Sequence, residues 1–220
     1  MLSLVTNIYL IRHAQSHGNL TAHFQGQIDT PLTPLGLAQA EALGNRFSGV
    51  ELHGVYASPL QRAHQTAGAI AGLHRLPVRI IPELSEIYGG AVQGVSFTEL
   101  RERDPEQFRV FDEQPHLFTG FCEDAESVAQ VYIRAVSALE EIATTHPGQN
   151  VAVISHGCTI RCLVCHAGGG TLQTLGRTQW TANTGVAHIT YDAHGGVALL
   201  GENNLTHLEG LDLEEVRTGV

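Results

Sequence analysis

The chain has 220 residues and a formal net charge of −10, and all 12 of its basic residues are arginine. An acidic chain of this kind is a poor ligand for nucleic acids, so we expect no nucleic-acid partner. A mass of 23.7 kDa with 43% hydrophobic residues is typical of one globular domain, which we expect to span residues 1–220. The oligomeric state is left open by the sequence, a dimer included.

The sequence also predicts where the protein resides. It has no apolar run near the roughly 18 residues that a membrane span needs. Its amino terminus has neither a basic segment nor a small-residue cleavage site. We therefore expect no membrane partner and a cytoplasmic location, in which the four cysteines stay reduced.

The first half of the chain alternates predicted strands and helices. An apolar, β-branched run ends at Arg12 and His13, and Thr33 with Pro34 is a typical helix start. The expected elements are, in order, a strand at residues 5–11, a helix at 34–47, a strand at 55–57, a helix from about 59 to 73 and a strand at 76–81.

Residues 83–122 lack a regular pattern, and we interpret 88–122 as an excursion that forms a lid or pocket wall. Four of the seven Phe residues lie in it: Phe108, Phe111, Phe118 and Phe121. The alternative is a local hydrophobic cluster that packs the excursion onto the body. An apolar pocket wall would favour a ligand with a hydrophobic body.

The second half continues the alternation. The expected elements are a short helix at 97–103, a helix at 127–145, a strand at 151–154, a helix to about 166, and a hairpin of 185–191 and 197–200. The acidic end, 209–220, is expected to be a loose tail. Alternating strands and helices predict an α/β fold: a three-layer α/β/α sandwich with a mainly parallel central sheet.

Polar residues follow three of these strands. His13 and His156 each follow a buried strand, and a third strand leads into Ser58 and Arg62. The carboxyl ends of parallel strands meet at one edge of a sheet, where ligands bind. Two imidazoles and two guanidiniums, those of Arg12 and Arg62, would then share one pocket. Arginines suit phosphate oxygens, and a neutral histidine can be a covalent nucleophile, so the pattern predicts phosphoryl transfer.

Six blocks of sequence, spread over residues 8–208, resemble the histidine phosphatase superfamily, the phosphoglycerate-mutase-like proteins. The blocks are Leu10-Ile11-Arg12-His13 with Asn19, Gln25 to Thr33 with Gly36, Ser58 to Ala63 with Gln65 to Ala67, Glu83-Leu84 with Glu86 and Gly90, Ser155-His156-Gly157, and Asn183-Thr184 with 204–208. One block would be weak, but six in this order are specific.

The resemblance implies a role for each matching residue. His13 would attack phosphorus and carry the phosphoryl group, and Glu86 would protonate the leaving oxygen and then activate water. Arg12, Arg62 and His156 would hold the phosphate oxygens, with Asn19, Gln25 and the Gly157 backbone completing the pocket. Because arginines supply the positive charge, we expect no metal and no cofactor. The nearby guanidiniums should keep His13 uncharged.

The loop that carries Glu86 departs from the family pattern. It lacks the Trp-Glu pair common in the phosphatases, and Ala91 with Gln93-Gly94 resembles the mutases. Ile87 and Tyr88 replace the Arg-His pair of the mutases, and the chain has no lysine for their mode of substrate recognition. These departures favour a phosphomonoester hydrolase. The alternatives are a phosphoglycerate-type mutase, or a phosphate-binding interaction domain without activity. Glu83 is the substitute if Glu86 is not the acid.

Two weaker signals remain. Cys162 and Cys165 with His166 match a haem-attachment motif, but they lie in a predicted helix and we expect buried structural thiols. Arg101, Arg103 and Arg109 are either contacts for an anionic substrate tail or a solvated helix face.

Overall fold

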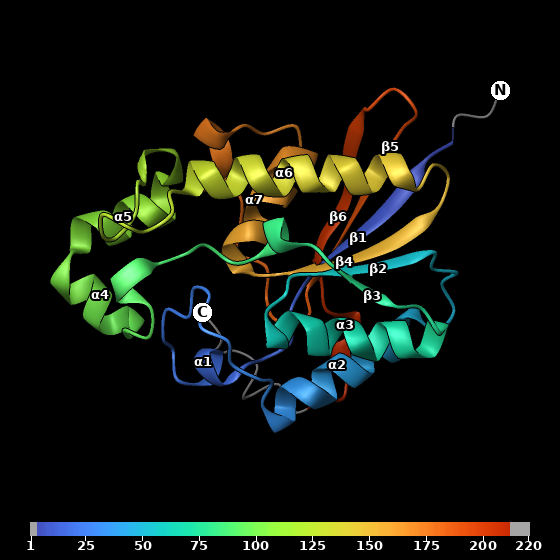
Figure 1. Ribbon diagram of the computed structural model, residues 1–220, viewed down its shortest axis with the longest axis horizontal. Helices are drawn as coiled ribbons and strands as arrows, with labels where there is room; N and C mark the ends of the chain where they lie inside the picture. The colour runs from blue at the N-terminus through green and yellow to red at the C-terminus, as the bar shows by residue number, and fades with distance from the viewer. Residues whose placement is uncertain (1–3, 212–220) are drawn as a thin grey trace.

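The computed structural model describes residues 4–211, and a six-stranded sheet lies at its centre (Figure 1). The strands are β1 (Thr6–Arg12), β2 (Gly54–Ala57), β3 (Val78–Ile80), β4 (Asn150–Ser155), β5 (Val186–Tyr191) and β6 (Val197–Asn204), in the spatial order β3-β2-β4-β1-β5-β6. Strands β3, β2, β4 and β1 run parallel to one another, whereas β5 is antiparallel to both β1 and β6. The expectation of a mainly parallel sheet is confirmed.

Helices connect these strands. The α-helices are α1 (His17–Leu20), α2 (Pro34–Phe47), α3 (Gln61–His74), α4 (Phe97–Arg103), α5 (Pro105–Glu113), α6 (Val128–Thr145) and α7 (Gly157–Ala167). The 3-10 turns are η1 (Pro82–Leu84), η2 (Gly90–Val92), η3 (Pro115–Leu117), η4 (Leu172–Arg177) and η5 (Thr206–Leu208). Within residues 4–211, no helix combines the length and apolar character that crossing a bilayer requires.

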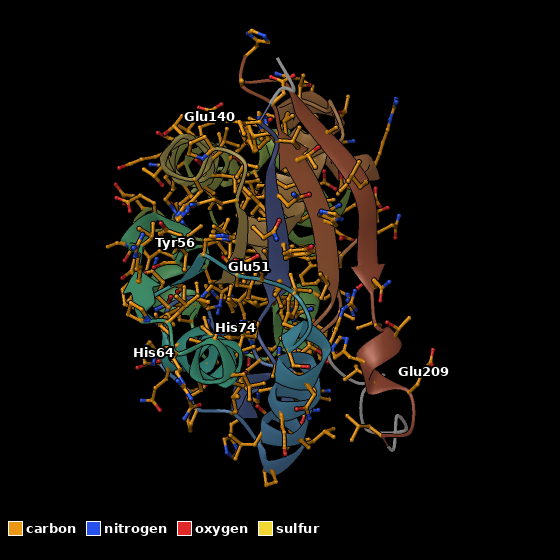
Figure 2. The ribbon with its side chains drawn as sticks, turned by 90° about the vertical axis from the view of Figure 1, so that its right-hand side faces the viewer. Glu51, Tyr56, His64, His74, Glu140 and Glu209 are labelled. Atoms are coloured by element: carbon orange, nitrogen blue, oxygen red, sulfur yellow. The ribbon has the colours of Figure 1, made fainter. Side chains whose placement is uncertain are left out.

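The sheet is covered on both faces. Helices α6 and α7 lie over one face and α2 and α3 over the other (Figure 1). Figure 2 shows this layering from the side, with Tyr56 of β2 between Glu140 of α6 and His64 of α3. Alternate residues of β1 serve the two layers: Ile8 belongs to the core under α6 and α7, and Ile11 to the core under α2 and α3. The three-layer α/β/α sandwich is thereby confirmed.

The excursion is more helical than the sequence indicated. Helix α4 has the predicted bounds, but α5 falls in a stretch predicted to be irregular. Its start signal is present: the Asp104 side chain accepts a hydrogen bond from the Gln107 backbone N–H, and Pro105 is the first helical residue. The signal was missed because α5 carries few apolar residues. Helices α4 and α5 lie at one end of the molecule, beyond the sheet (Figure 1).

Phenylalanines of the excursion pack against the body of the protein. Phe111 and Phe118 are buried in one cluster with Val131 of α6 and Cys162 of α7. Strand β6 also runs four residues past its predicted end at 200, to Asn204. Of the predicted acidic tail, Glu209 and Gly210 are exposed, and 212–220 lie outside the described residues.

Candidate active site

The register of the sheet brings the predicted histidines together. Arg12 of β1 lies opposite Ser155 of β4, and Ala57 of β2 lies opposite Ile154. The next residues continue this pairing, since the His13 N–H donates to the Ser155 carbonyl at 2.9 Å. His13 and His156 therefore leave adjacent strands side by side, and their ring centroids are 5.0 Å apart.

A cavity of about 420 Å³ opens beside these strand ends. Seven of the eight predicted site residues line it: Arg12, His13, Asn19, Gln25, Arg62, Glu86 and Gly157. The eighth, His156, is fully buried next to His13 and does not line the cavity. Segments from residue 12 to residue 157 thus converge on one space.

The tautomer of His13 follows from its neighbour. Its Nδ1 lies 2.7 Å from the Ala14 carbonyl, which can only accept, so Nδ1 carries the proton. The lone pair of the neutral ring is therefore on Nε2. Burial, and then the charges of Arg62 and Arg12, hold the pKa of His13 well below its usual value. His13 is a neutral imidazole in a cationic surrounding, as the sequence predicted.

His156 is hydrogen-bonded through the other ring nitrogen, Nε2, rather than Nδ1. Its Nε2 lies 2.7 Å from the Ser58 hydroxyl, while its Nδ1 is buried without a hydrogen-bond partner among the described residues. Burial, and then Arg62, also hold the pKa of His156 well below its usual value. If the Ser58 hydroxyl donates to Nε2, Nδ1 carries the proton and can donate to an anion.

The two arginines are fixed by backbone carbonyls. Arg12 Nη1 donates to the Thr181 carbonyl at 2.7 Å. Arg62 donates to the carbonyls of Ile28 and Gly26, at 2.8 and 2.7 Å. Within residues 4–211, neither guanidinium has a carboxylate oxygen within 4.0 Å. Burial lowers the pKa of Arg62 to about 10, which leaves it a cation at neutral pH.

Three buried nitrogens at this site have no protein acceptor in the described part of the chain: Arg12 Nε, Arg62 Nε and His156 Nδ1. Buried donors without partners are rare and cost free energy. A tetrahedral oxyanion would supply acceptor oxygens to all three and would offset the charge of both guanidiniums. The site is therefore built for an anion such as phosphate.

Glu86 faces the same space from the loop after η1. Its Oε1 accepts from the Ile87 N–H at 2.9 Å, and its Oε2 from the Cys158 N–H at 3.2 Å, in the first turn of α7. A Cβ on Gly157 would lie 3.6 Å from Glu86 Oε2 and 3.7 Å from Arg12 Cζ. Glycine thus leaves open the space between the carboxylate and the guanidinium.

Asn19 and Gln25 present their amides to the cavity. Asn19 Oδ1 accepts from Ser16 and Asn183, and Gln25 Oε1 accepts from the hydroxyls of Ser16 and Thr30. With the oxygens used in this way, the NH₂ groups are the donors that remain for a bound anion.

Aromatic side chains form another part of the cavity lining. Its aromatic lining residues are Phe24, Phe97, Phe108, Phe111 and Trp180. Phe108 and Phe111 belong to the predicted excursion, which therefore both packs onto the body and walls the cavity. Trp180 was missed, although it is the single tryptophan of the chain; its Nε1 donates to Asp112 Oδ1 at 2.8 Å.

The structure separates the three arginines of the excursion. Arg101 lines the cavity, with its guanidinium carbon 4.6 Å from the Phe108 ring centroid. Arg109 instead forms exposed ion pairs with Glu106 and Glu113, at 2.7 and 3.2 Å, and Arg103 is exposed. Only Arg101 of the three is placed to meet a substrate.

Asn183 is a site residue to which the sequence motif alone assigns no role. It lines the cavity, and its Nδ2 donates to the His13 carbonyl at 2.9 Å. Cys162 and Cys165 are buried free thiols, as expected, and Cys158, also buried and free, lines the cavity. Among the described residues, no three His, Cys, Asp or Glu side chains gather closely enough to hold a metal ion.

Comparison with known proteins identifies the class. The family model of the histidine phosphatase superfamily (branch 1) matches residues 8–204, so the chain belongs to this superfamily. "Phosphoserine phosphatase 1" of Hydrogenobacter thermophilus is 36% identical over 163 residues, 73% of this chain and 75% of that protein. "Metal-independent phosphoserine phosphatase" of Arabidopsis thaliana is 36% identical over 73% of this chain and 68% of its own length.

Solved structures agree with this assignment. "Bacillus stearothermophilus YhfR" superposes with a TM-score of 0.86 at 31% identity, covering 92% of this chain and 99% of that one. Phosphoserine phosphatase of Entamoeba histolytica, solved with 3-phosphoglyceric acid, gives a TM-score of 0.80 at 28% identity, with coverage of 92% and 99%. The chain is a phosphatase of the histidine phosphatase type. Relatives with lower identity include "Probable phosphoglycerate mutase GpmB" of Photorhabdus laumondii, 30% identical over 71% of this chain and 72% of that protein.

Proposed function

We propose that this phosphatase hydrolyses phosphomonoesters through a phosphohistidine formed on His13. One observation carries the proposal: the Nε2 lone pair of a neutral imidazole lies among two guanidiniums that have no carboxylate partner in the described chain. A bound phosphate group would accept hydrogen bonds from Arg12, Arg62 and His156. These donors are fixed before the substrate arrives, so they can stabilise charge that develops in the transition state.

In the first step, Nε2 of His13 forms a bond to phosphorus, and the bond between phosphorus and the ester oxygen breaks. The leaving oxygen takes a proton from the carboxyl group of Glu86. In the second step, the Glu86 carboxylate takes a proton from water, whose oxygen attacks phosphorus. The bond from phosphorus to Nε2 breaks, and inorganic phosphate and neutral His13 are released.

The aromatic end of the cavity bears on the choice of substrate. We place the leaving group there, against Phe97, Phe108 and Phe111, and assign the excursion at 88–122 the role of pocket wall. This lining favours esters with an apolar or aromatic body over small sugar phosphates. Phosphoserine, named in the two relatives, is the second candidate, because Arg101 supplies a cation outside the phosphate end.

The test is phosphate release from a panel of aryl, alkyl, sugar and amino-acid phosphates, measured with excess chelator present. We expect turnover in chelator, and an alkaline quench should trap an acid-labile, alkali-stable phosphoenzyme in which His13 alone is phosphorylated. Dependence on added metal, or no labelled His13 with any ester, would contradict the mechanism.

The product distinguishes a mutase from a hydrolase. Such an enzyme would form the phosphate isomer of 3-phosphoglycerate faster than it releases phosphate. The departures at Ile87 and Tyr88, together with the absence of lysine, favour hydrolysis. Isomer formation that exceeds phosphate release would reverse this preference.

A further inference from the structure

The loop that carries Glu86 has no regular secondary structure of its own. It runs between the 3-10 turns η1 and η2, from Ser85 to Gly89. A proton donor must nevertheless be held within about half an ångström of its working position. Donors from outside the loop therefore have to fix its backbone.

One guanidinium supplies two of them. Arg134 of α6 donates to three backbone carbonyls: that of Glu83 in η1, and those of Ser85 and Glu86 in the loop. The bonds to Ser85 and Glu86 measure 2.7 and 3.1 Å. Arg134 is mostly buried, with 20% of its side chain exposed.

The opposite edge of the guanidinium is bound to Glu126. Arg134 Nε lies 2.7 Å from Glu126 Oε1, and Nη2 lies 2.9 Å from Oε2. Glu126 also holds the far side of the loop, because its Oε2 accepts from the Tyr88 N–H at 3.1 Å and its own N–H donates to the Tyr88 carbonyl at 2.8 Å. The pair Arg134–Glu126 thus grips the loop on both sides of Glu86.

We infer that Arg134, held by Glu126, is a positioning residue that sets the Glu86 carboxylate for both proton transfers. This inference rests on the proposed role of Glu86. Arg134 neither lines the cavity nor donates a hydrogen bond to the Glu86 carboxylate, so its effect must pass through the loop backbone. Loss of Arg134 would remove one donor from each of three carbonyls. The Ser85 carbonyl would keep the Thr159 hydroxyl as a donor, and the Glu86 carbonyl would keep the Gln27 amide.

The test is a double-mutant comparison of Arg134→Met and Glu86→Gln, each alone and together. We expect Arg134→Met to lower kcat by about 10- to 100-fold and to change KM by less than about threefold. This loss in kcat is smaller than the full contribution of a general acid, about 10²- to 10⁴-fold, because Glu86 itself is still present. In the Glu86→Gln background the same change should lower kcat less than about twofold, because residues that act as one unit are not additive.

A second measurement separates positioning from general loosening. An aryl phosphate with an activated leaving group needs little protonation, whereas an alkyl phosphate needs it fully. Arg134→Met should therefore slow phosphorylation by the alkyl ester at least about fivefold more than by 4-nitrophenyl phosphate. It should also raise the steady-state level of phosphorylated His13 with the latter ester.

Matched variants complete the design. Arg109→Met removes an arginine that pairs with carboxylates on exposed α5, those of Glu106 and Glu113, and should leave kcat within about twofold of wild type. Arg134→Lys keeps the charge but not the fork of N–H groups, and should fall between wild type and Arg134→Met. If Arg134→Met does not fold, Arg134→Lys and Glu126→Gln carry the same comparison.

Equal losses from Arg134→Met in both backgrounds, or equal slowing of both esters, would overturn the inference alone. A Glu86→Gln enzyme with wild-type turnover would overturn the acid assignment as well. Absence of any phosphorylated His13 in wild type would instead overturn the proposed function.

Discussion

Inorganic phosphate should stabilise this protein, and the size of the effect follows from the site. Phosphate oxygens would meet buried donors that have no partner among the described residues, at Arg12, Arg62 and His156. A ligand at 100 times its Kd stabilises the folded state by about 2.7 kcal/mol. For a domain of this size each kcal/mol raises Tm by roughly 2–4 °C, so the midpoint should rise by about 5–11 °C.

A single arginine should account for much of this shift. A hydrogen bond to a charged group contributes about 1.5–3 kcal/mol, so Arg12→Met should weaken phosphate binding roughly 10- to 150-fold. At the phosphate concentration used for wild type, the stabilisation then falls to between about 0.3 and 1.4 kcal/mol. Arg109→Met, which lies outside the site, should keep the full shift.

The assay is thermal unfolding with excess chelator, with sodium chloride at equal ionic strength as the reference. Titration of phosphate gives Kd and the midpoint together. Equal midpoint shifts with phosphate and chloride, or equal responses of Arg12→Met and Arg109→Met, would refute phosphate binding at this site.

Three further predictions follow from the same geometry. His13→Ala should lower kcat on the order of 10⁴-fold or more, yet the protein should stay folded by circular dichroism, because the ring makes one hydrogen bond, to Ala14; full activity would contradict the assignment. Burial and Arg62 depress the pKa of both His13 and His156 below the ordinary 6.5. As the pH falls through about 6.5, the unfolded chain therefore binds more protons than the folded protein does. Stability is therefore complete above that pH and is lost below it, by up to about 1.4 kcal/mol per pH unit for each histidine; urea unfolding at pH 7 and 5.5 should show a smaller loss for His13→Ala than for wild type, and equal losses would be inconsistent. Phe108→Ala should lower kcat/KM about tenfold for an aryl phosphate and less than twofold for a small sugar phosphate, measured by phosphate release; equal effects would remove Phe108 from substrate selection.

The sequence by itself determined the layers of the fold. Buried strands and amphipathic helices follow local rules of periodicity and capping, so the sheet at β1 and β4 and the helices α2, α4 and α6 could be read from neighbouring residues. Helix α5 was missed because its start signal at Asp104 and Pro105 precedes a mostly polar segment. The length of β6 was also missed, because its pairing with β5 depends on contacts rather than on its own pattern.

The sequence also indicated which residues would share a site, since His13, Ser58 and His156 each follow a strand and parallel strands end at one edge. It could not determine their relative depth. Tertiary structure alone decided that His156 lies buried beside His13 and outside the cavity lining, that Arg101 lines the cavity while Arg109 does not, and that Arg134 holds the loop of Glu86. Each of these depends on a hydrogen bond or contact between segments far apart in the chain, which no local pattern encodes.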